Sequence, residues 1–301
     1  MSASLRSRSV RQVLLIASPV SGGGRVLKAL PAVGARLREL DVDTRIVMSE
    51  SLDHARALTR EALAEGRVPV SFGGDGLAGA VAGAAAQVRG LIGVLPGGSG
   101  NDFCRHVGIP NDPVVACELL STGTAVDIDL GEANGSLFLG IASLGFDSEA
   151  NAAANRAPRI LGRGIYVYGA FAALLRWHRA TFIVAADAGT EEFLGWSVIC
   201  ANTSVYGAGM FVAPQARVDD GLLDVVSLRD VGRLHFIRAF PKVFRGTHLA
   251  DPAVHLTRSE QVRVTASRPF DVYADGDRIA TTPVTIRVRR DAVQVLLPEV
   301  R

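Results

Sequence analysis

The sequence predicts a two-domain chain, in which an α/β domain with a parallel sheet precedes a β-sandwich domain. Three observations lead to this fold class. The 301 residues are 48% hydrophobic, which is enough apolar material for two cores. Up to about residue 130, short apolar runs alternate with helical segments, and beyond it most segments are short and β-rich. The predicted domains cover residues 9–130 and 131–301, and a return of the last residues to the first domain is left open.

The first domain is expected to hold four strands, at the short apolar runs Val13–Ala17, Thr44–Met48, Val68–Phe72 and Leu91–Leu95. Segments with helical periodicity lie between them, at Val26–Leu40, Asp53–Ala64 and Leu77–Ala86. Strands that alternate with helices of this length predict right-handed βαβ units on a parallel sheet. Ligands bind beyond the carboxyl ends of the strands in such sheets, so the loops at these ends are the first candidates for a site.

The second domain shows the alternation of half-buried antiparallel strands, as in Val262-Arg263-Val264-Thr265. Closely spaced segments of this kind favour a sandwich or a curled sheet. One helix is expected among them, near Gly164 to His178. Its apolar face is expected to cover the sandwich and consists of Ile165, Tyr168, Ala172 and Leu175.

Composition limits the classes of function. A formal net charge of +2 argues against a general nucleic-acid binder. Three widely spaced cysteines predict neither a disulfide framework nor a metal site, and they are typical of a reducing cytoplasm. The first apolar run is too short for a signal-peptide core, and no stretch approaches the roughly 20 apolar residues that span a bilayer. We therefore expect a cytoplasmic protein that at most rests on the inner face of a membrane.

Two glycine-rich loops lie between a predicted strand and a predicted helix, where free N–H groups and the helix dipole can bind phosphate. "PVSGGGRVLKAL" follows the first strand but lacks the ending of a P-loop, so a plain turn is the simpler interpretation. "FGGDGLAGA" follows the third strand, and its glycines let the main chain approach a nucleotide closely. Asp75 in this loop either meets a cation, the nucleotide or a basic side chain, or caps the helix that follows.

The loop "LPGGSGNDFCRHVGIP" follows the fourth strand and ends in a short helix. Ser99 can hydrogen-bond a phosphate or a base, and Asn101 can bridge loops. Asp102 is expected to cap the helix that starts at Phe103. That cap explains Asp102 but gives no purpose to the glycines before it.

Two acidic motifs lie in the second domain. In "ARVDDGLLDV", Asp219 and Asp220 precede a glycine, and a carboxylate with backbone carbonyls can hold a hard cation. In "VYADGDRIA", Asp275 and Asp277 flank Gly276, and two such carboxylates can divide the work of proton transfer. An ordinary Asp-Gly turn is the alternative at both places.

Six segments in this order resemble the diacylglycerol-kinase-like family of bacterial lipid kinases, and the resemblance covers nearly the whole chain. The family's first-strand loop is similar to the stretch that holds Pro19, Ser21 and Gly22, and its Gly-Gly-Asp-Gly loop is similar to Gly73–Gly76. Its Pro-x-Gly-Thr-x-Asn-Asp-Phe loop resembles "PGGSGNDF", and its later segments resemble "GFD", "VAPQARVDDGLLDV" and "DGD". NAD kinase and phosphofructokinase share the Gly-Gly-Asp-Gly loop but do not account for these other segments.

The resemblance implies an N-terminal α/β nucleotide domain, a C-terminal β-sandwich and an active site between them. It implies transfer of the γ-phosphate of ATP, with Mg²⁺, to a lipid hydroxyl, with diacylglycerol as the expected acceptor and phosphatidic acid as the product. The expected nucleotide-binding residues are Ser49, Gly73, Gly74, Asp75, Gly76, Leu77, Ala78, Gly79, Ala80, Ser99 and Asn101. A structural Mg²⁺ site is expected at Asp220 with the carbonyls of Arg217 and Leu222. Asp277 is the expected catalytic base, with Asp275 nearby, and Asp75 is expected to support Mg²⁺.

The chain departs from the family pattern on the nucleotide side. The family usually has threonine after Gly-Gly-Asp-Gly and then Asn-Glu, where this chain has Leu77, Gly79 and Ala80. Asp277 replaces a glutamate and is one methylene shorter, which affects the reach of a general base. The alternatives are a catalytically impaired nucleotide- or lipid-binding regulator, or a kinase for a sphingoid base, a polyprenol or another lipid alcohol. The sequence leaves open whether the protein is a monomer or a homodimer.

Overall fold

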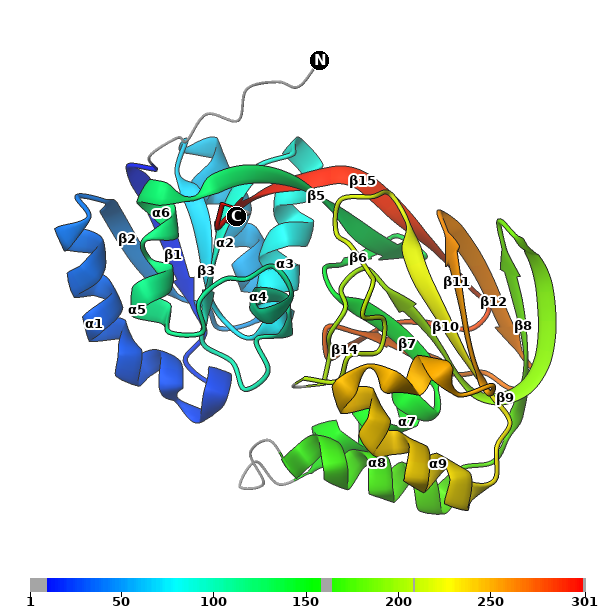
Figure 1. Ribbon diagram of the computed structural model, residues 1–301. Coiled ribbons are helices and arrows are strands. Elements are labelled where there is room, and N and C mark those ends of the chain that lie inside the picture. Colours follow the sequence, from blue (N-terminus) through cyan, green and yellow to red (C-terminus); the bar gives the residue numbers. More distant parts are fainter. Residues whose placement is uncertain (1–9, 158–163, 208, 300–301) are drawn as a thin grey trace. The chain divides into compact units, whose positions relative to one another are not determined.

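The computed structural model describes residues 10–157, 164–207 and 209–299 (Figure 1). These residues form two compact units, one built from the chain up to Asp129 and from Arg290 onward, the other from Leu130 to Arg289. The first unit has the parallel α/β architecture and the second is β-rich, so the predicted fold class is confirmed. No helix in the described ranges is long and apolar enough to cross a membrane.

The first unit is built on a parallel sheet in the order β4-β3-β1-β2. Its strands are β1 (Gln12–Ala17), β2 (Asp43–Met48), β3 (Val68–Gly73) and β4 (Leu91–Pro96). The connecting helices are α1 (Arg25–Glu39), α2 (Leu52–Ala64) and α3 (Asp75–Ala85), followed by the short α4 (Asp102–His106), α5 (Pro113–Ala116) and α6 (Leu119–Thr122). All predicted strands and long helices of this unit are confirmed to within two residues. The parallel order places the ends of β1, β3 and β4 next to one another, which positions the glycine-rich loops.

The last strand, β15 (Val284–Leu297), adds to this sheet by pairing in parallel with β4 at Gln294 and Val295. Its early residues pair antiparallel with β12 in the second unit. One strand therefore belongs to the sheets of both units.

The second unit is antiparallel, with β9 at its centre because β9 pairs with β7, β8 and β10. The strands before β9 are β5 (Thr124–Ala133), β6 (Ser136–Phe138), β7 (Ile141–Gly145) and β8 (Ala180–Ala186), and β9 itself is Gly189–Ala201. Those after it are β10 (Leu223–Arg229), β11 (Val254–Ser259), β12 (Gln261–Ala266), β13 (Asp271–Ala274) and β14 (Asp277–Thr281). The buried core between the layers includes Trp196, Phe182 and Phe138.

The helices of the second unit depart from the sequence prediction. Besides α8 (Gly164–Arg176) it contains α7 (Phe146–Arg156), α9 (Arg233–Ala239) and the 3-10 segments η4 (Phe240–Arg245) and η5 (Thr247–Ala250), none of which was predicted. The expectation for the face of α8 is wrong, since Tyr168 and Leu175 are 49% and 63% exposed. The helix instead buries Ala173 and Leu174, and a Cβ at Gly169 would collide with Ala154 of α7. Helix-on-helix packing against α7 thus decides which side of α8 is covered.

Candidate active site

The glycine-rich loops after β3 and β4 pack main chain to main chain. The carbonyl of Gly73 accepts a hydrogen bond of 2.7 Å from the N–H of Gly97. A Cβ added to Gly98 would lie 2.5 Å from the Cα of Gly74, and one added to Gly97 would lie 2.5 Å from a methyl of Val26. Contacts this short exclude any larger residue, so the glycines have a structural purpose that the sequence left unexplained.

A cavity of about 320 Å³ opens beside these loops in the first unit. It is lined by Arg25, Lys28, Ala29, Phe72, Pro96, Gly97, Gly98, Asn101, Asn111 and Pro113. Its charged lining is basic, because Arg25 and Lys28 come from the first turns of α1 and the lining includes no acidic residue. A cavity with this charge, at the carboxyl ends of parallel strands, suits an anion such as a phosphate.

Arg25 also ties loops together. Its Nε donates to the carbonyl of Gly22 at 3.1 Å, and its Nη2 donates to the hydroxyl of Ser99 at 3.3 Å. The predicted phosphate ligand Ser99 is therefore hydrogen-bonded to a guanidinium that lines the cavity. Asn101 bridges loops as predicted, since its Oδ1 accepts from the N–H of Gly98 at 2.7 Å and its Nδ2 donates to Asn111 at 3.0 Å.

Asp75 caps a helix, but not the one that follows it. Asp75 is the first residue of α3, and its Oδ1 accepts a hydrogen bond of 3.0 Å from the N–H of Phe103 in α4. The helix was expected to start at Phe103 with Asp102 as its cap, whereas α4 begins at Asp102, Asn101 occupies the N-cap position and Asp75 accepts the N–H of Phe103. A Cβ added to Gly100 would lie 3.3 Å from Asp75 Oδ2 and 3.0 Å from Asp102 Oδ2, so both carboxylates border this glycine.

The pKa of Cys104 in α4 reflects its burial and the two neighbouring carboxylates. Burial raises the pKa of the Cys104 thiol, and the carboxylates of Asp75 and Asp102 raise it further. Asp75 and Asp102 thus set two carboxylates beside Gly100 at the start of α4. Carboxylate oxygens are the ligands that Mg²⁺ prefers, and Asp75 is the residue that would meet a cation arriving with a nucleotide.

Most of the other residues predicted to bind the nucleotide have buried side chains, so only their main chain could contact a ligand. Leu77, Ala78 and Ala80 are each 4% exposed in α3, so their side chains pack in the core. The N–H groups of Leu77 and Ala78 donate to the carbonyl of Gly74, and Asp75 and Gly76 in the first turn of α3 are half-buried. Ser49 is 7% exposed, and its hydroxyl donates to the carbonyl of Ser51.

The predicted metal residues of the second unit face an arginine. Arg258 forms ion pairs with Asp220 and, at 3.6 Å, with Asp224, while the N–H of Leu222 donates to Asp220 Oδ1 at 3.1 Å. Arg217 pairs with Asp219 instead. Among the described residues no group of three or more His, Cys, Asp or Glu side chains could hold a metal ion. Asp220 is thus engaged by Arg258 and by the N–H of Leu222, and a Mg²⁺ site at Asp220 with the carbonyls of Arg217 and Leu222 stays a prediction.

Asp275 and Gly276 form the two-residue turn between β13 and β14, in which Ala274 pairs with Asp277. Both turn residues have positive φ, 52° and 93°, as a type I′ hairpin requires. The carboxylate of Asp275 accepts hydrogen bonds from the N–H groups of Leu139 and Gly140, at 2.7 and 2.9 Å. Asp275 thus braces the hairpin against the start of β7, and Asp277 projects as an exposed residue at the start of β14.

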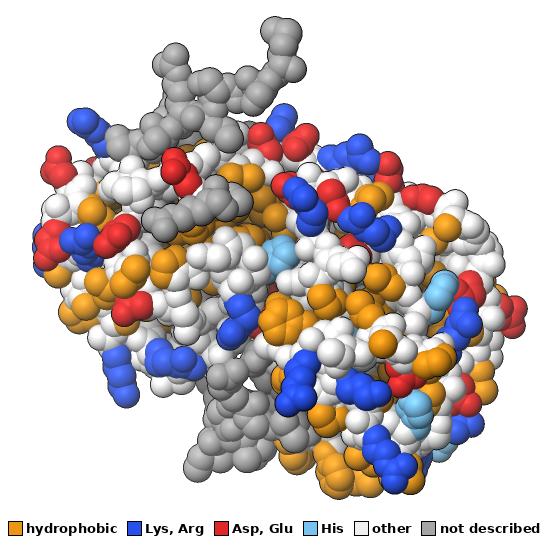
Figure 2. Space-filling model, in the orientation of Figure 1, with side chains coloured by type: hydrophobic (Ala, Val, Ile, Leu, Met, Phe, Trp, Pro, Cys, Tyr) orange, Lys and Arg blue, Asp and Glu red, His pale blue; other side chains and the backbone are white. Residues whose placement is uncertain are grey.

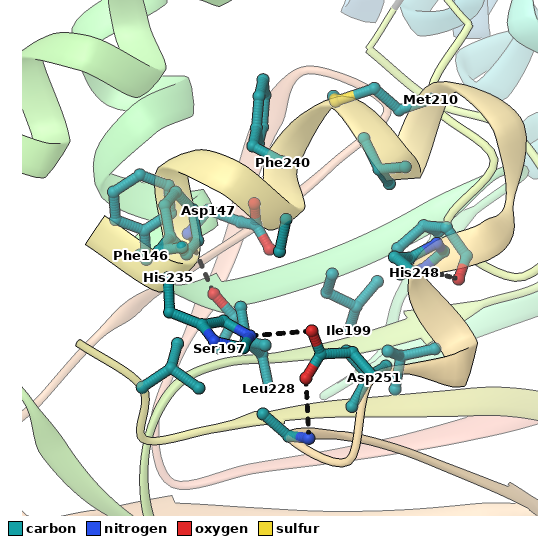
Figure 3. Close-up of a pocket in the computed structure, with 18 of the residues that line it drawn as sticks. Phe146, Asp147, Ser197, Ile199, Met210, Leu228, His235, Phe240, His248 and Asp251 are labelled. Carbon is teal, nitrogen blue, oxygen red and sulfur yellow. Dashed lines mark hydrogen bonds and ion pairs between the residues drawn. The ribbon is translucent and has the colours of Figure 1, made fainter. Parts of the chain in front are cut away.

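An apolar pocket of about 90 Å³ lies within the second unit (Figure 3). Phe240 and Met210 line one side, and Ile199 and Leu228 of β9 and β10 line the other. Its polar lining includes Asp147, Ser197, Tyr206, His235, His248 and Asp251. A mostly apolar pocket with a few convergent polar groups is the usual form of a site for an amphipathic molecule.

Asp147 is the most perturbed of the described carboxylates in this pocket. Burial raises its pKa to about 6, although the hydroxyl of Tyr206, which donates to its Oδ1 at 2.9 Å, and the contact with Ser197 lower it. His235 is engaged with Asp251, whose Oδ2 lies 2.8 Å from its Nε2. Asp147 can therefore exchange a proton near neutral pH and can hydrogen-bond a hydroxyl inside an apolar pocket.

Several of these residues were missed from the sequence. The basic residues of the first helical turns after "SGGG", Arg25 and Lys28, were a usable signal for a phosphate site in a loop that was judged a plain turn. Asp147 stood in a family motif without a role. The partnership of Asp75 with α4 had no local signal, because it joins residues 28 positions apart.

A basic, glycine-lined cavity in an α/β unit and an apolar pocket in a β-rich unit suit a two-domain phosphotransferase with an apolar substrate. Comparison with known proteins agrees. Residues 12–133 match the diacylglycerol kinase catalytic domain, and residues 140–297 match the YegS C-terminal NAD kinase beta sandwich-like domain. The chain belongs to this family, and it is a lipid kinase.

Two relatives that are named kinases align with this chain over nearly their full length. A diacylglycerol kinase of Mycobacterium tuberculosis is 34% identical over 98% of this chain and 97% of its own length. A Pseudomonas aeruginosa protein named "Probable lipid kinase YegS-like" is 34% identical over 95% of this chain and 94% of its own. A crystal structure of a diacylglycerol kinase from Bacillus anthracis superposes with a TM-score of 0.76 at 18% identity, covering 97% of this chain and 98% of that one. This last likeness confirms the fold.

Proposed function

We propose that this protein transfers the γ-phosphate of ATP to the hydroxyl of a membrane lipid, diacylglycerol, and releases phosphatidic acid and ADP. The observation that supports the class of acceptor is the apolar pocket of the second unit, whose lining includes Asp147, a carboxylate with a raised pKa. Acyl chains fit an apolar lining, and a polar group of the lipid other than its reacting hydroxyl can hydrogen-bond to Asp147. Diacylglycerol satisfies both requirements without a positive charge.

The phosphates of ATP are proposed to occupy the cavity beside the β3 and β4 loops. Arg25 and Lys28 offset their charge, the main chain of Gly97 and Gly98 allows close approach, and Ser99 donates a hydrogen bond. The half-buried first turn of α3, at Asp75 and Gly76, is proposed to offer N–H donors to the same anion. Mg²⁺ enters as part of the nucleotide substrate, with Asp75 Oδ2 as its proposed carboxylate ligand.

Phosphoryl transfer needs a base for the lipid hydroxyl, and we assign this role to Asp277. Its carboxylate accepts the proton while the lipid oxygen attacks the γ-phosphorus in line and the bond to the β-phosphate oxygen breaks. Asp275 acts as a positioning residue, because its carboxylate is occupied by two N–H groups of the β6–β7 connection. The basic cavity stabilises the charge that develops on the transferred group.

The proposal is tested by incubating the purified protein with radiolabelled ATP, Mg²⁺ and mixed micelles that contain dioleoylglycerol, sphingosine or a polyprenol. We expect labelled phosphatidic acid and no other labelled lipid. Asp277→Asn should still bind ATP in a calorimetric titration but lose at least about 100-fold in turnover. Glu192→Gln is the matched control, since it removes an exposed carboxylate from the same unit.

Three results would contradict the assignment. A labelled sphingoid base or polyprenol would replace diacylglycerol as the acceptor. ATP binding with no labelled lipid would favour the regulator over the enzyme. Near-normal turnover by Asp277→Asn would remove Asp277 from the role of base.

A further inference from the structure

Residues 233–245, comprising α9 and η4, form one helical segment over the apolar pocket, and we refer to them as the roof segment. Phe236, Phe240 and Val243 of this segment line the pocket. Phe236 stacks on Trp196 with ring centroids 4.4 Å apart, which fixes this inner face against the sheet. A helix that covers a core in this way normally presents polar side chains to water on its other face.

The outer face of the roof segment is apolar as well. Leu234, Ile237 and Phe244 are 60%, 52% and 44% exposed. Leu234 and Ile237 are three residues apart and so lie on the same side of α9. Large apolar side chains that gather on a surface mark a contact with another molecule or with a membrane.

Basic residues accompany these apolar side chains. The roof segment contains Arg233, Arg238, Lys242 and Arg245 and no acidic residue. Arg238, Lys242 and Arg245 are exposed, and none of the three forms an ion pair within the described part of the chain. Figure 2 shows basic side chains set among hydrophobic ones over this region, at the lower right.

We propose that the roof segment docks this protein on an anionic bilayer surface. A helical surface with Leu, Ile and Phe beside unpaired Lys and Arg matches the boundary between acyl chains and anionic headgroups. The proposal rests on the proposed function, because a kinase for a membrane lipid must reach that lipid at the bilayer. The segment that lines the acceptor pocket on its inner face would then touch the membrane with its outer face.

The charges distinguish this surface from α8. Tyr168, Phe171 and Leu175 of α8 are also exposed, but Arg176 is the one charged residue between 164 and 176. An uncharged apolar face gains nothing from anionic lipids, whereas each basic residue near an anionic surface strengthens binding roughly fivefold. We therefore expect anionic lipid to strengthen membrane binding through the roof segment and not through α8.

The test is flotation with vesicles of phosphatidylcholine alone or mixed equally with phosphatidylglycerol, without ATP and at low and high NaCl. The charge variant is Arg238→Gln/Lys242→Gln/Arg245→Gln, and the apolar variant is Leu234→Ser/Ile237→Ser. The matched controls are Arg38→Gln/Arg60→Gln/Arg263→Gln for charge and Val88→Ser/Val115→Ser for apolar exposure, all at exposed positions. Phe171→Ser/Leu175→Ser tests α8.

We expect the full chain to bind the anionic vesicles, and high salt to weaken this binding. The charge variant should bind on the order of 100-fold more weakly, and the controls should bind like the unmodified chain. Both roof variants should keep their turnover on short-chain diacylglycerol dispersed in detergent, which shows that they are folded. Vesicle binding without phosphorylation of any lipid would refute the proposed function and leave the docking surface standing.

Three outcomes would overturn the docking proposal. The first is unaltered vesicle binding by both roof variants. The second is loss of anionic-vesicle binding in the α8 variant with full binding by the charge variant. The third is a dimer of the unmodified chain that dissociates in the apolar variant, which would assign the face to a second copy.

Discussion

Substitutions of Asp75 test the proposed site most directly, because its two carboxylate oxygens are assigned different roles. Oδ1 accepts the N–H of Phe103 at 3.0 Å, and Phe103 is 3% exposed, so this N–H loses its partner if the acceptor is removed. Oδ2 is the oxygen assigned to the cation that accompanies ATP. Asp75→Ala removes both functions, whereas Asp75→Asn keeps an acceptor oxygen and removes the charge.

The magnitudes separate the two variants. An orphaned buried N–H costs about 1–3 kcal/mol and the loss of a helix cap costs about 1 kcal/mol, so we expect Asp75→Ala to lose about 2 kcal/mol of unfolding free energy. In a chain of this size that loss lowers the melting temperature by roughly 5 °C. Asp75→Asn should lose less than about 1 kcal/mol, yet its turnover should fall by roughly 100-fold or more, because electrostatic support of the phosphates is lost.

Calorimetric melting and a radiolabel assay with matched ATP and diacylglycerol concentrations measure both effects on the same preparations. Asp75→Asn with turnover within about threefold of the unmodified protein would refute the catalytic assignment and leave a structural cap. Equal destabilisation of Asp75→Asn and Asp75→Ala would refute the cap, since it would show that α4 depends on the charge rather than on the acceptor.

Three further predictions follow from packing and charge. Gly98→Ala should destabilise the first unit by about 1–3 kcal/mol in denaturant titrations and weaken ATP binding, because its Cβ would lie 2.5 Å from a neighbouring Cα. Asp147 has a raised pKa of about 6, so the folded state binds its proton more tightly and loses stability as pH rises from about 4 to 6. Asp147→Asn should therefore be more stable than the unmodified protein above pH 6, by at most about 3 kcal/mol, and this advantage should vanish below pH 4. Arg258→Ala should cost roughly 3 kcal/mol by leaving the buried Asp224 carboxylate uncompensated, and millimolar Mg²⁺ should raise the melting temperature of this variant but not of the unmodified protein.

Local patterns were sufficient to predict the α/β unit. Three of its strands are largely buried runs such as Val13–Ala17, and α1 and α2 each bury one apolar stripe, so period and length identify the main elements. The hairpin at Asp275-Gly276 was also predictable, because both central residues need positive φ and Asp-Gly supplies it.

Long-range contacts explain what the sequence could not predict. Helix α7 is rich in alanine and polar residues, so its sequence has no apolar periodicity that would predict a helix. Its packing on α8 stabilises it instead. The exposed face of α8 follows from that same contact. Arg258 lies 38 residues from Asp220 along the chain, and no local pattern pairs an arginine with a predicted metal ligand.

The glycines of the two loops show how one set of residues can serve the fold and the proposed reaction. Gly97 and Gly98 are required by contacts with Val26 and Gly74 even without a ligand, so their presence does not by itself indicate a nucleotide. The basic residues are different, because the hydrogen bonds between the loops involve Arg25 but not Lys28, so loop packing does not explain a second cation beside the same cavity. Glycine removes the side chains that would keep an anion away, and the cations supply the attraction. The assignment of a phosphate site therefore depends more on these two cations than on the glycine motif that first drew attention to the loops.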